Sequence, residues 1–269
     1  MERNMVLGFI GTGNMGGALA RAARRRTAGE NILLANRTPE KADALAAELS
    51  CRRVENLEAA AEAGMLFLGV KPQGMPGLLS EIAPALKSRT DDFLLVSMAA
   101  GVTIQRIQEL AGGEYPVIRM MPNTPAAIGQ GMSLYCCSPQ VERGREQEFL
   151  ELMAGAGRFS RISENLMSAG GAVAGCGPAF ADLFIEALAD GGVACGLPRA
   201  QALELAAQML VGAGNLVLET GEHPGRLKDA VCSPGGSTIQ GVRKLEAAGF
   251  CGSVIEAVIA AYEKSEALG

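Results

Sequence analysis

Short runs of apolar residues alternate with segments of helical periodicity over the first part of the chain. Five apolar runs predict buried strands, at Val6–Ile10, Ile32–Ala35, Met65–Val70, Phe93–Met98 and Val117–Met121. The segments between them predict helices at Asn14–Arg26, Pro39–Leu49, Leu57–Ala63, Met75–Leu86 and Ile104–Leu110. Two later runs, Gly131–Cys136 and Arg158–Ile162, lie on either side of a helical pattern near Gln140–Met153 and extend the same sheet. This alternation predicts a mostly parallel sheet covered by helices on both faces.

The pattern changes after Ser163, where alanine, leucine and glycine recur with helical periodicity to the end of the chain. A length of 269 residues is about 1.8 times a domain of roughly 150 residues, which favours two domains. We therefore expect an α/β domain over residues 1–162, followed by an all-α domain over residues 163–269.

Composition excludes several classes of function. The net charge is 24 − 29 = −5 and tryptophan is absent, so neither a basic surface nor stacking platforms for nucleic acid are expected. A single histidine, His223, leaves no basis for a His-rich zinc site, and no metal is expected. Seven cysteines without a CxxC pair, and no secretory pattern, indicate reduced thiols in a cytoplasmic protein. The uncharged stretch from Asn165 to Ala181 has 17 residues and is too short to span a bilayer of ~30 Å.

The strongest local motif is Gly11-Thr12-Gly13-Asn14-Met15-Gly16, which follows the first strand and opens the first helix. In this setting Gly11 permits the tight turn, Gly13 lets a pyrophosphate approach the backbone, and Gly16 lets the helix pack closely on the sheet. The free N–H groups at the helix start then bind the phosphates. A tight turn that binds nothing would not need three glycines at this spacing. The motif therefore indicates a Rossmann-type dinucleotide-binding domain.

The end of the second strand indicates which dinucleotide binds. An NAD site places Asp or Glu there, whereas this strand continues into Asn36-Arg37-Thr38. Arg37 can pair with a 2′-phosphate, so NADPH is favoured and NADH is possible; a solvated turn arginine is the alternative. The run Arg24-Arg25-Arg26 is expected to complement the carboxyl end of its helix and to meet solvent.

Three further loops follow predicted strands, at the edge where open α/β sheets bind ligands. They are Val70-Lys71-Pro72-Gln73, Ser97-Met98-Ala99-Ala100-Gly101 and Met121-Pro122-Asn123-Thr124-Pro125. Together with the glycine motif they outline one crevice.

The second domain carries two motifs of interest. Gly175-Cys176-Gly177-Pro178 interrupts a helical pattern and indicates close approach to a ligand or to another helix. In Ser233-Pro234-Gly235-Gly236-Ser237-Thr238, Ser233 is expected to be the N-cap and Pro234 the first helical residue. The following N–H groups would converge on a carboxylate, a plain helix cap being the alternative. His223 lies in a turn between helices and is expected to be structural.

The chain resembles pyrroline-5-carboxylate reductase over its whole length. The motifs that carry the resemblance occur in the order GFIGTGNMGGA, FLGVKPQ, SMAAGV, RMMPNTPAAIGQG, GCGPAF, LADGGVACGLPR and KDAVCSPGGSTI. The resemblance implies a Rossmann domain, an all-α C-terminal dimerisation domain, and dimers that often assemble further, commonly as five dimers. It also implies reduction of 1-pyrroline-5-carboxylate to L-proline by NAD(P)H, the last step of proline biosynthesis.

The resemblance also implies which residues form the site. The cofactor is expected to meet Ile10, Gly11, Thr12, Gly13, Asn14, Met15, Asn36, Arg37, Asn56, Val70, Lys71, Pro72, Met98, Ala99 and Ala100. The substrate is expected to meet Glu164, Ser233, Gly236, Ser237 and Thr238, in a site completed across the dimer. The sequence departs from the family pattern at Ala230, at Cys176 and at Ser237, so a cofactor contact from position 230 is in doubt.

The chemistry needs few side chains. An iminium substrate already carries its proton, so hydride transfer to it needs no strong base; if the neutral imine binds, the Thr238 hydroxyl is the candidate donor. A β-hydroxyacid dehydrogenase, the nearest enzyme alternative, uses a lysine on its interdomain helix, and residues 166–193 contain none. A catalytically silent NADPH sensor would have the same crevice but would not bind a proline analogue.

Overall fold

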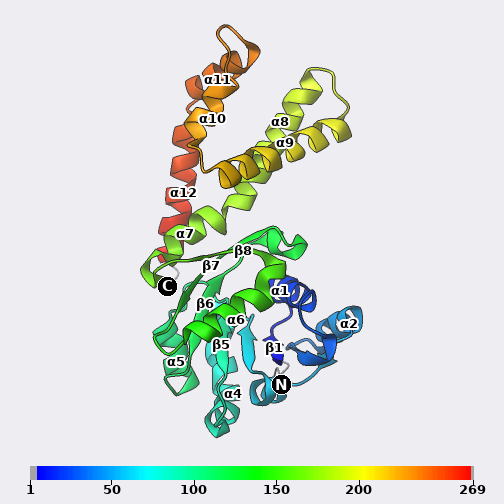
Figure 1. Ribbon diagram of the computed structural model, residues 1–269, viewed down its shortest axis with the longest axis vertical. Coiled ribbons are helices and arrows are strands. Elements are labelled where there is room, and N and C mark those ends of the chain that lie inside the picture. The colour runs from blue at the N-terminus through cyan, green and yellow to red at the C-terminus, as the bar shows by residue number, and fades with distance from the viewer. Residues whose placement is uncertain (1–4, 268–269) are drawn as a thin grey trace. The chain divides into compact units, whose positions relative to one another are not determined.

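The computed structural model describes residues 5–267 (Figure 1). Its contacts divide the chain into two compact units. Of the described residues, 5–176 and 261–267 form the sheet unit, and Gly177–Ala260 forms the helical unit.

The sheet unit is built on one sheet of eight strands in the order β3-β2-β1-β4-β5-β6-β7-β8. The strands are β1 (Leu7–Ile10), β2 (Ile32–Ala35), β3 (Arg52–Arg53), β4 (Met65–Leu68), β5 (Leu94–Ser97), β6 (Val117–Met121), β7 (Gly131–Cys137) and β8 (Gly157–Arg161). Neighbouring strands are parallel except for β6 and β7. The predicted mostly parallel sheet is therefore confirmed, with every expected strand present. The prediction missed β3, which has only two residues, both of them exposed arginines without an apolar pattern.

Helices cover both faces of this sheet. They are α1 (Asn14–Arg24), α2 (Pro39–Leu49), α3 (Asn56–Glu62), α4 (Met75–Ser88), α5 (Ile104–Ala111), α6 (Arg143–Met153) and α7 (Met167–Ala174). Short 3₁₀ turns, η1 to η5, lie at Gly29–Asn31, Pro72–Gly74, Thr124–Ile128, Ala154–Ala156 and Glu164–Leu166. Each predicted helix is present, with its ends displaced by a few residues at most.

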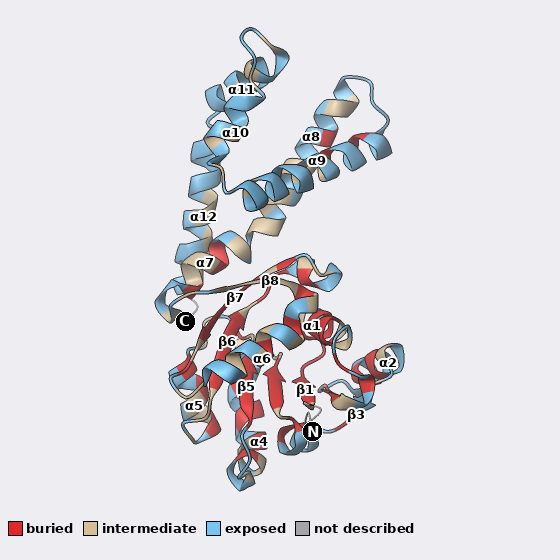
Figure 2. Cartoon of the chain, in the orientation of Figure 1, coloured by how far each residue is buried: buried red, intermediate tan, exposed pale blue. Residues whose placement is uncertain are grey.

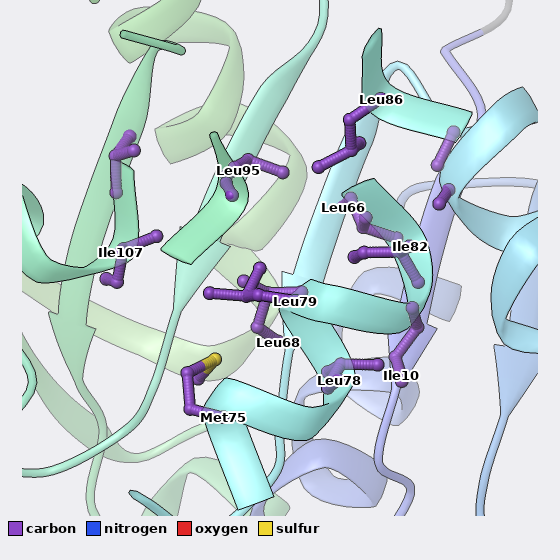
Figure 3. Packing of buried hydrophobic residues seen from close by; sticks show 14 of the residues in the cluster. Ile10, Leu66, Leu68, Met75, Leu78, Leu79, Ile82, Leu86, Leu95 and Ile107 are labelled. Carbon is purple, nitrogen blue, oxygen red and sulfur yellow. The ribbon is translucent and has the colours of Figure 1, made fainter. Parts of the chain in front are cut away.

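Two separate apolar clusters hold the helices on the sheet. On one face, α3, α4, α5 and α7 pack on the strands, and Figure 3 shows Met75, Leu79 and Ile82 of α4 against Leu66 and Leu68 of β4. On the other face, α1, α2 and α6 pack around stacked rings of Phe9 and Phe67, whose centroids lie 4.4 Å apart. Complete burial of such side chains contributes about 1.5–3 kcal/mol each. These two clusters fix the strand ends on which the candidate cofactor site is built.

The helical unit contains α8 (Gly177–Ala194), α9 (Arg199–Thr220), α10 (Pro224–Ala230), α11 (Ser237–Ala247) and most of α12 (Phe250–Glu266). Helices α8 and α9 pack on each other, and the ring centroids of Phe184 in α8 and Phe250 in α12 lie 5.5 Å apart. Gly175 and Cys176 form the turn that separates α7 from α8, so the predicted interruption of the helix occurs there.

The contact-based division falls later in the chain than the expected boundary between residues 162 and 163. Helix α7 belongs to the sheet unit because Met167 is buried in its core. In addition, Gly171 approaches Met121 so closely that a Cβ atom there would overlap the Met121 sulfur. The expected boundary marks the end of the strand pattern and stays a prediction.

Most of the helical unit is exposed, as Figure 2 shows by the pale blue of α8 to α12. By length and hydropathy, the helical segments Glu164–Ala194 and Arg199–Thr220 are long and apolar enough to cross a membrane, and the bent pair α11 and α12 could form a third span. The uncharged run considered in the sequence has 17 residues, whereas the helical segment that contains it has 31. The expectation that this part of the chain is too short to span a bilayer is therefore wrong.

Candidate functional site

The glycine motif forms a tight turn between β1 and α1, as predicted. Gly11 has a φ of +95°, and a Cβ atom built on it would lie 2.7 Å from the backbone of Gly69, which follows β4. A Cβ atom at Gly16 would overlap the carbonyl oxygen of Gly11. Both positions therefore require glycine so that the turn can pack against the neighbouring strand end and against α1.

Gly13 differs from these two glycines because a Cβ atom on it would meet no protein atom within 4 Å. The space beside it is open, at the amino end of an 11-residue helix whose first N–H groups have no intrahelical acceptor. The Thr12 hydroxyl is buried nearby and has no hydrogen-bond partner within the described residues. An open glycine, free amides and an unpaired hydroxyl fit a dinucleotide pyrophosphate.

Asn36 links this turn to the end of β2. Its Oδ1 accepts a hydrogen bond from the backbone N–H of Thr12 at 3.0 Å, and its Nδ2 donates to the carbonyl oxygen of Thr38 at 3.0 Å. Arg37, between the two linked residues, is exposed and makes no ion pair or hydrogen bond in the described part of the chain. Its guanidinium is therefore available to an anion.

The strand register brings the predicted cofactor loops to one edge of the sheet. Ile10 is opposite Ala35 on one side and Leu68 on the other, and Leu68 is opposite Ser97. The residues that follow these strand ends therefore lie side by side. They are Gly11, Asn36, Gly69 and Met98, and the Met98 N–H donates to the carbonyl oxygen of Leu68 at 3.2 Å.

The other predicted cofactor residues on this edge differ in exposure. Lys71 and Ala100 are exposed, Val70 and Pro72 are half-buried, and Ala99 is buried. Gly69 was not predicted as a site residue, although its position immediately after a buried strand and its close approach to Gly11 place it at the same edge.

Two asparagines near the crevice form hydrogen bonds with other residues of the chain. Asn56, at the start of α3, donates from Nδ2 to both carboxylate oxygens of Glu81, each at 3.1 Å. Asn123, in the third predicted loop, is buried, accepts from the Met132 N–H at 2.9 Å and donates to the Ala174 carbonyl at 3.0 Å. Asn123 therefore holds β7 and the end of α7 in place.

The arginines at the end of α1 bind carbonyl groups of other segments rather than those of their own helix, so the expected pairing with the carboxyl end of α1 is wrong. The Arg24 Nε donates to the carbonyl oxygen of Leu49 at 2.8 Å, and Arg25 donates to that of Gly155 at 2.8 Å. Arg26 is exposed. None of the three is near the glycine turn, because α1 extends away from it for 11 residues.

Glu164 is tied into the sheet unit. Its Oε1 accepts from the backbone N–H of Ile104 at 2.7 Å and from the Arg119 guanidinium at 3.0 Å. The Arg119 side chain is only 6% exposed, so Glu164 neutralises a buried cation and also binds the amino end of α5. Sequence reasoning missed Arg119, which lies in an apolar strand 45 residues away.

An open cavity of about 610 Å³ lies beside Glu164, between α5 and the ends of β7 and β8. Its lining includes Cys136 and Cys137, where burial raises the thiol pKa to about 11 and about 12, respectively. None of the cofactor loops lines it, so the glycine turn rather than this cavity is the candidate cofactor site.

The helix start predicted in the helical unit is present, but its local structure differs from the prediction. Helix α11 begins at Ser237 with Gly236 as its N-cap. Pro234 and Gly235 are instead the central residues of a turn closed by a hydrogen bond from the Gly236 N–H to the Ser233 carbonyl at 3.0 Å. Gly235 has a φ of +72°, which this type of turn requires at its third residue. The assignment of Ser233 as N-cap and Pro234 as first helical residue is therefore wrong.

The corrected helix start still offers free donors. Ser237 and Thr238 are exposed in the first turn of α11, where backbone N–H groups have no intrahelical acceptor. The nearby His223 caps α10, since its Nδ1 accepts from the Gly225 N–H at 3.1 Å. This confirms a structural role for the histidine. Among the described residues, no group of three His, Cys, Asp or Glu side chains could hold a metal ion.

Family models match both parts of the sequence. The model for pyrroline-5-carboxylate reductase dimerisation matches residues 164–268. The model described as NADP oxidoreductase, coenzyme F420-dependent, matches residues 6–101, which include the glycine turn.

Reductases of other organisms are similar to this chain over nearly its whole length. The pyrroline-5-carboxylate reductases of Escherichia coli and of Synechocystis are 41% and 42% identical to it, covering 97% and 98% of this chain and the same shares of their own. The crystal structure of the Plasmodium falciparum pyrroline carboxylate reductase with NADP bound is similar, with a TM-score of 0.87 and 33% identity over 99% of this chain and 98% of that one. The Coxiella burnetii reductase has a TM-score of 0.91 at 27% identity, over 99% of both chains.

Proposed function

The chain belongs to the pyrroline-5-carboxylate reductase family, and we propose how its own residues perform the reaction of that family. The protein is an oxidoreductase that reduces 1-pyrroline-5-carboxylate to L-proline with NAD(P)H, in proline biosynthesis. The match to named reductases over 97% or more of the chain carries this conclusion. We therefore do not assign the alternative activity, that of a β-hydroxyacid dehydrogenase.

NADPH is the hydride donor. We assign its pyrophosphate to the start of α1, beside Gly13 and the unpaired Thr12 hydroxyl, and its 2′-phosphate to Arg37. The remaining contacts are assigned to Ile10, Gly11, Asn14, Met15, Asn36, Asn56, Val70, Lys71, Pro72, Met98, Ala99 and Ala100. The end of β2 carries no carboxylate, and this supports a preference for NADPH over NADH, because Asp or Glu there would repel a 2′-phosphate.

The substrate carboxylate is assigned to the start of α11, where Gly236, Ser237 and Thr238 offer backbone donors and the Ser233 hydroxyl packs against Gly236. A helix amino end attracts an anion through its free N–H groups and its dipole. Glu164 has only its second oxygen available for the substrate side, since its first binds Ile104 and Arg119.

The reaction then needs little from side chains beyond positioning. The bound nucleotide supplies a hydride to the imine carbon, and an iminium substrate brings the proton that the product nitrogen keeps. The start of α11 holds the carboxylate and so orients the ring, an effect that contributes up to about 7–11 kcal/mol. For the neutral imine, the exposed Thr238 hydroxyl is the proposed proton donor.

A spectrophotometric assay tests the function directly. The absorbance of reduced nucleotide should fall when the imine is added, and faster with NADPH than with NADH. The proline analogue tetrahydro-2-furoic acid should compete with the imine. No change with either nucleotide would contradict the proposed function, and equal rates would contradict only the cofactor preference.

We propose that the protein is a homo-oligomer, in which residues 164–268 form a dimer and five dimers form a decamer. We place it in the cytoplasm, without a nucleic-acid or membrane partner.

Carboxylates on α8 favour a second copy of the chain, rather than lipid, as the cover of the apolar helices. Asp182, Glu186 and Asp190 are exposed at spacings of four residues, which places them on one helix face. An aspartate near the middle of a membrane-spanning helix costs about 2.5–3.5 kcal/mol.

A further inference from the structure

Asn36 occupies the position at which an NAD-binding domain of this fold carries its ribose-binding carboxylate, directly after β2. Here the side chain is turned into the protein. Its oxygen accepts from the Thr12 N–H and its nitrogen donates to the Thr38 carbonyl, each at 3.0 Å. A backbone N–H can only donate and a carbonyl can only accept, so the two partners together require a side chain that accepts and donates at once, as the Asn36 amide does.

These two bonds connect the two turns on which the nucleotide phosphates depend. Thr12 belongs to the glycine turn, and Thr38 ends the turn that carries Arg37. The first bond also occupies the Thr12 N–H, so the pyrophosphate must rely on the amides from Gly13 onward and on the free Thr12 hydroxyl. The second bond fixes the backbone on the far side of Arg37, whose own side chain has no partner within the described chain.

We infer that Asn36 is a positioning residue for cofactor specificity: it fixes Arg37 at a set place relative to the glycine turn, so that one nucleotide engages both. This rests on the proposed use of NADPH. Aspartate at this position would keep an acceptor for Thr12 but lose the donor to Thr38. Leucine, of similar volume, would lose both bonds.

The test is a comparison of NADP⁺ and NAD⁺ dissociation constants, measured by isothermal titration without substrate. Asn36→Leu should weaken both nucleotides, because the glycine turn loses its anchor. It should weaken NADP⁺ by roughly tenfold more than NAD⁺, because a displaced Arg37 loses a charge-assisted contact. Arg37→Ala should weaken NADP⁺ alone.

The double variant separates positioning from a direct role. In the Arg37→Ala background, Asn36→Leu should change both dissociation constants by the same factor, since no guanidinium is left to place. The inference is overturned if Asn36→Leu leaves the ratio of the two constants unchanged in the otherwise native chain. It is also overturned if the ratio changes equally in both backgrounds.

Asn36→Ser, too short to reach either partner, replaces Asn36→Leu if the leucine variant does not fold. The same titrations on the unmodified protein distinguish a failure of the proposed cofactor from a failure of the proposed role of Asn36. Failure of both nucleotides to bind would remove the proposed cofactor, whereas NADP⁺ binding with an unchanged ratio would remove only the role of Asn36.

Discussion

The Thr238 hydroxyl is exposed in the first turn of α11 and has no hydrogen-bond partner in the described chain. We expect Thr238→Ala to lower kcat/KM by about a hundredfold or more, because a positioned proton donor typically contributes 10²–10⁴-fold. Steady-state kinetics with NADPH measure the loss, and titration should show unchanged NADP⁺ binding. Thr238→Ser should retain most activity, and Ser237→Ala, one residue away, should lose less. Unchanged turnover in Thr238→Ala would remove the hydroxyl from the mechanism.

Tyr135 makes the sheet unit sensitive to alkali. Burial and a hydrogen bond to Glu146, at 2.9 Å, raise the pKa of the phenol from 10 to about 12. Between these values the unfolded chain has released the proton and the folded chain has kept it. The free energy of unfolding should therefore be unaffected by this group below about pH 10 and should fall as the pH rises from about 10 to about 12.

Tyr135→Phe should reduce the slope of this loss, measured by urea unfolding at several alkaline pH values. The slope should not vanish, because burial also raises the pKa values of Cys136 and Cys137. In a spectroscopic titration, one of the three tyrosines should ionise late in the native protein and be missing from the variant. An unchanged slope in Tyr135→Phe would contradict this account.

Among the secondary-structure elements, α5 depends on a contact from a distant segment. Glu164 binds the amino end of α5 through the Ile104 N–H and neutralises the buried Arg119 of β6. We expect Glu164→Leu to lower the free energy of unfolding by roughly 1–3 kcal/mol, because it leaves a buried guanidinium without its partner. Urea unfolding at neutral pH measures the change.

Glu109, which lies in α5 itself, offers a matched control. It pairs with Arg106 on the surface, both side chains being about half exposed, and such pairs contribute about 0–1 kcal/mol. Glu109→Leu should therefore cost less than Glu164→Leu. Equal losses would show that Glu164 contributes no more than an ordinary surface charge.

The elements of the sheet unit were predictable from sequence because most of its buried strands are runs of apolar residues. The start of α11 was not. A serine followed by proline fits both an N-cap with a first helical residue and the opening of a β-turn, and only the positive φ of Gly235 distinguishes them. Ser237 and Thr238 were still named as site residues, although only the observed arrangement places both of them in the first turn.

Contacts between distant segments account for the rest of what the sequence could not reveal. The link from Thr12 to Asn36 joins residues 24 apart, and that from Arg119 to Glu164 joins residues 45 apart. In the sequence, Asn36 indicated only the lack of a carboxylate and Arg119 only an interruption of an apolar strand. Their partners become evident only once the strand register is known.

For the molecule as a whole, the two units differ in how they bury apolar side chains. The sheet unit has two well-buried clusters, whereas in the helical unit only Ala189, Ala202 and Ala206 are buried among the apolar residues. Leu183 is 67% exposed and Ile255 is 58% exposed. An exposed apolar surface of this extent is typical of an interaction surface, and the match to a dimerisation model over residues 164–268 supports a second copy as its partner.

A charge placed in this surface should therefore dissociate the assembly. We expect Leu183→Glu to reduce the molar mass measured by light scattering after size exclusion, because the carboxylate would be buried unpaired against the second copy. Leu57→Glu, in α3 of the sheet unit and 48% exposed, is the control and should leave the mass unchanged. If the active site is completed across the dimer, Leu183→Glu should also lose activity, while NADP⁺ binding to the sheet unit should persist. A protein that is monomeric and active without any substitution would refute both the assembly and the shared site.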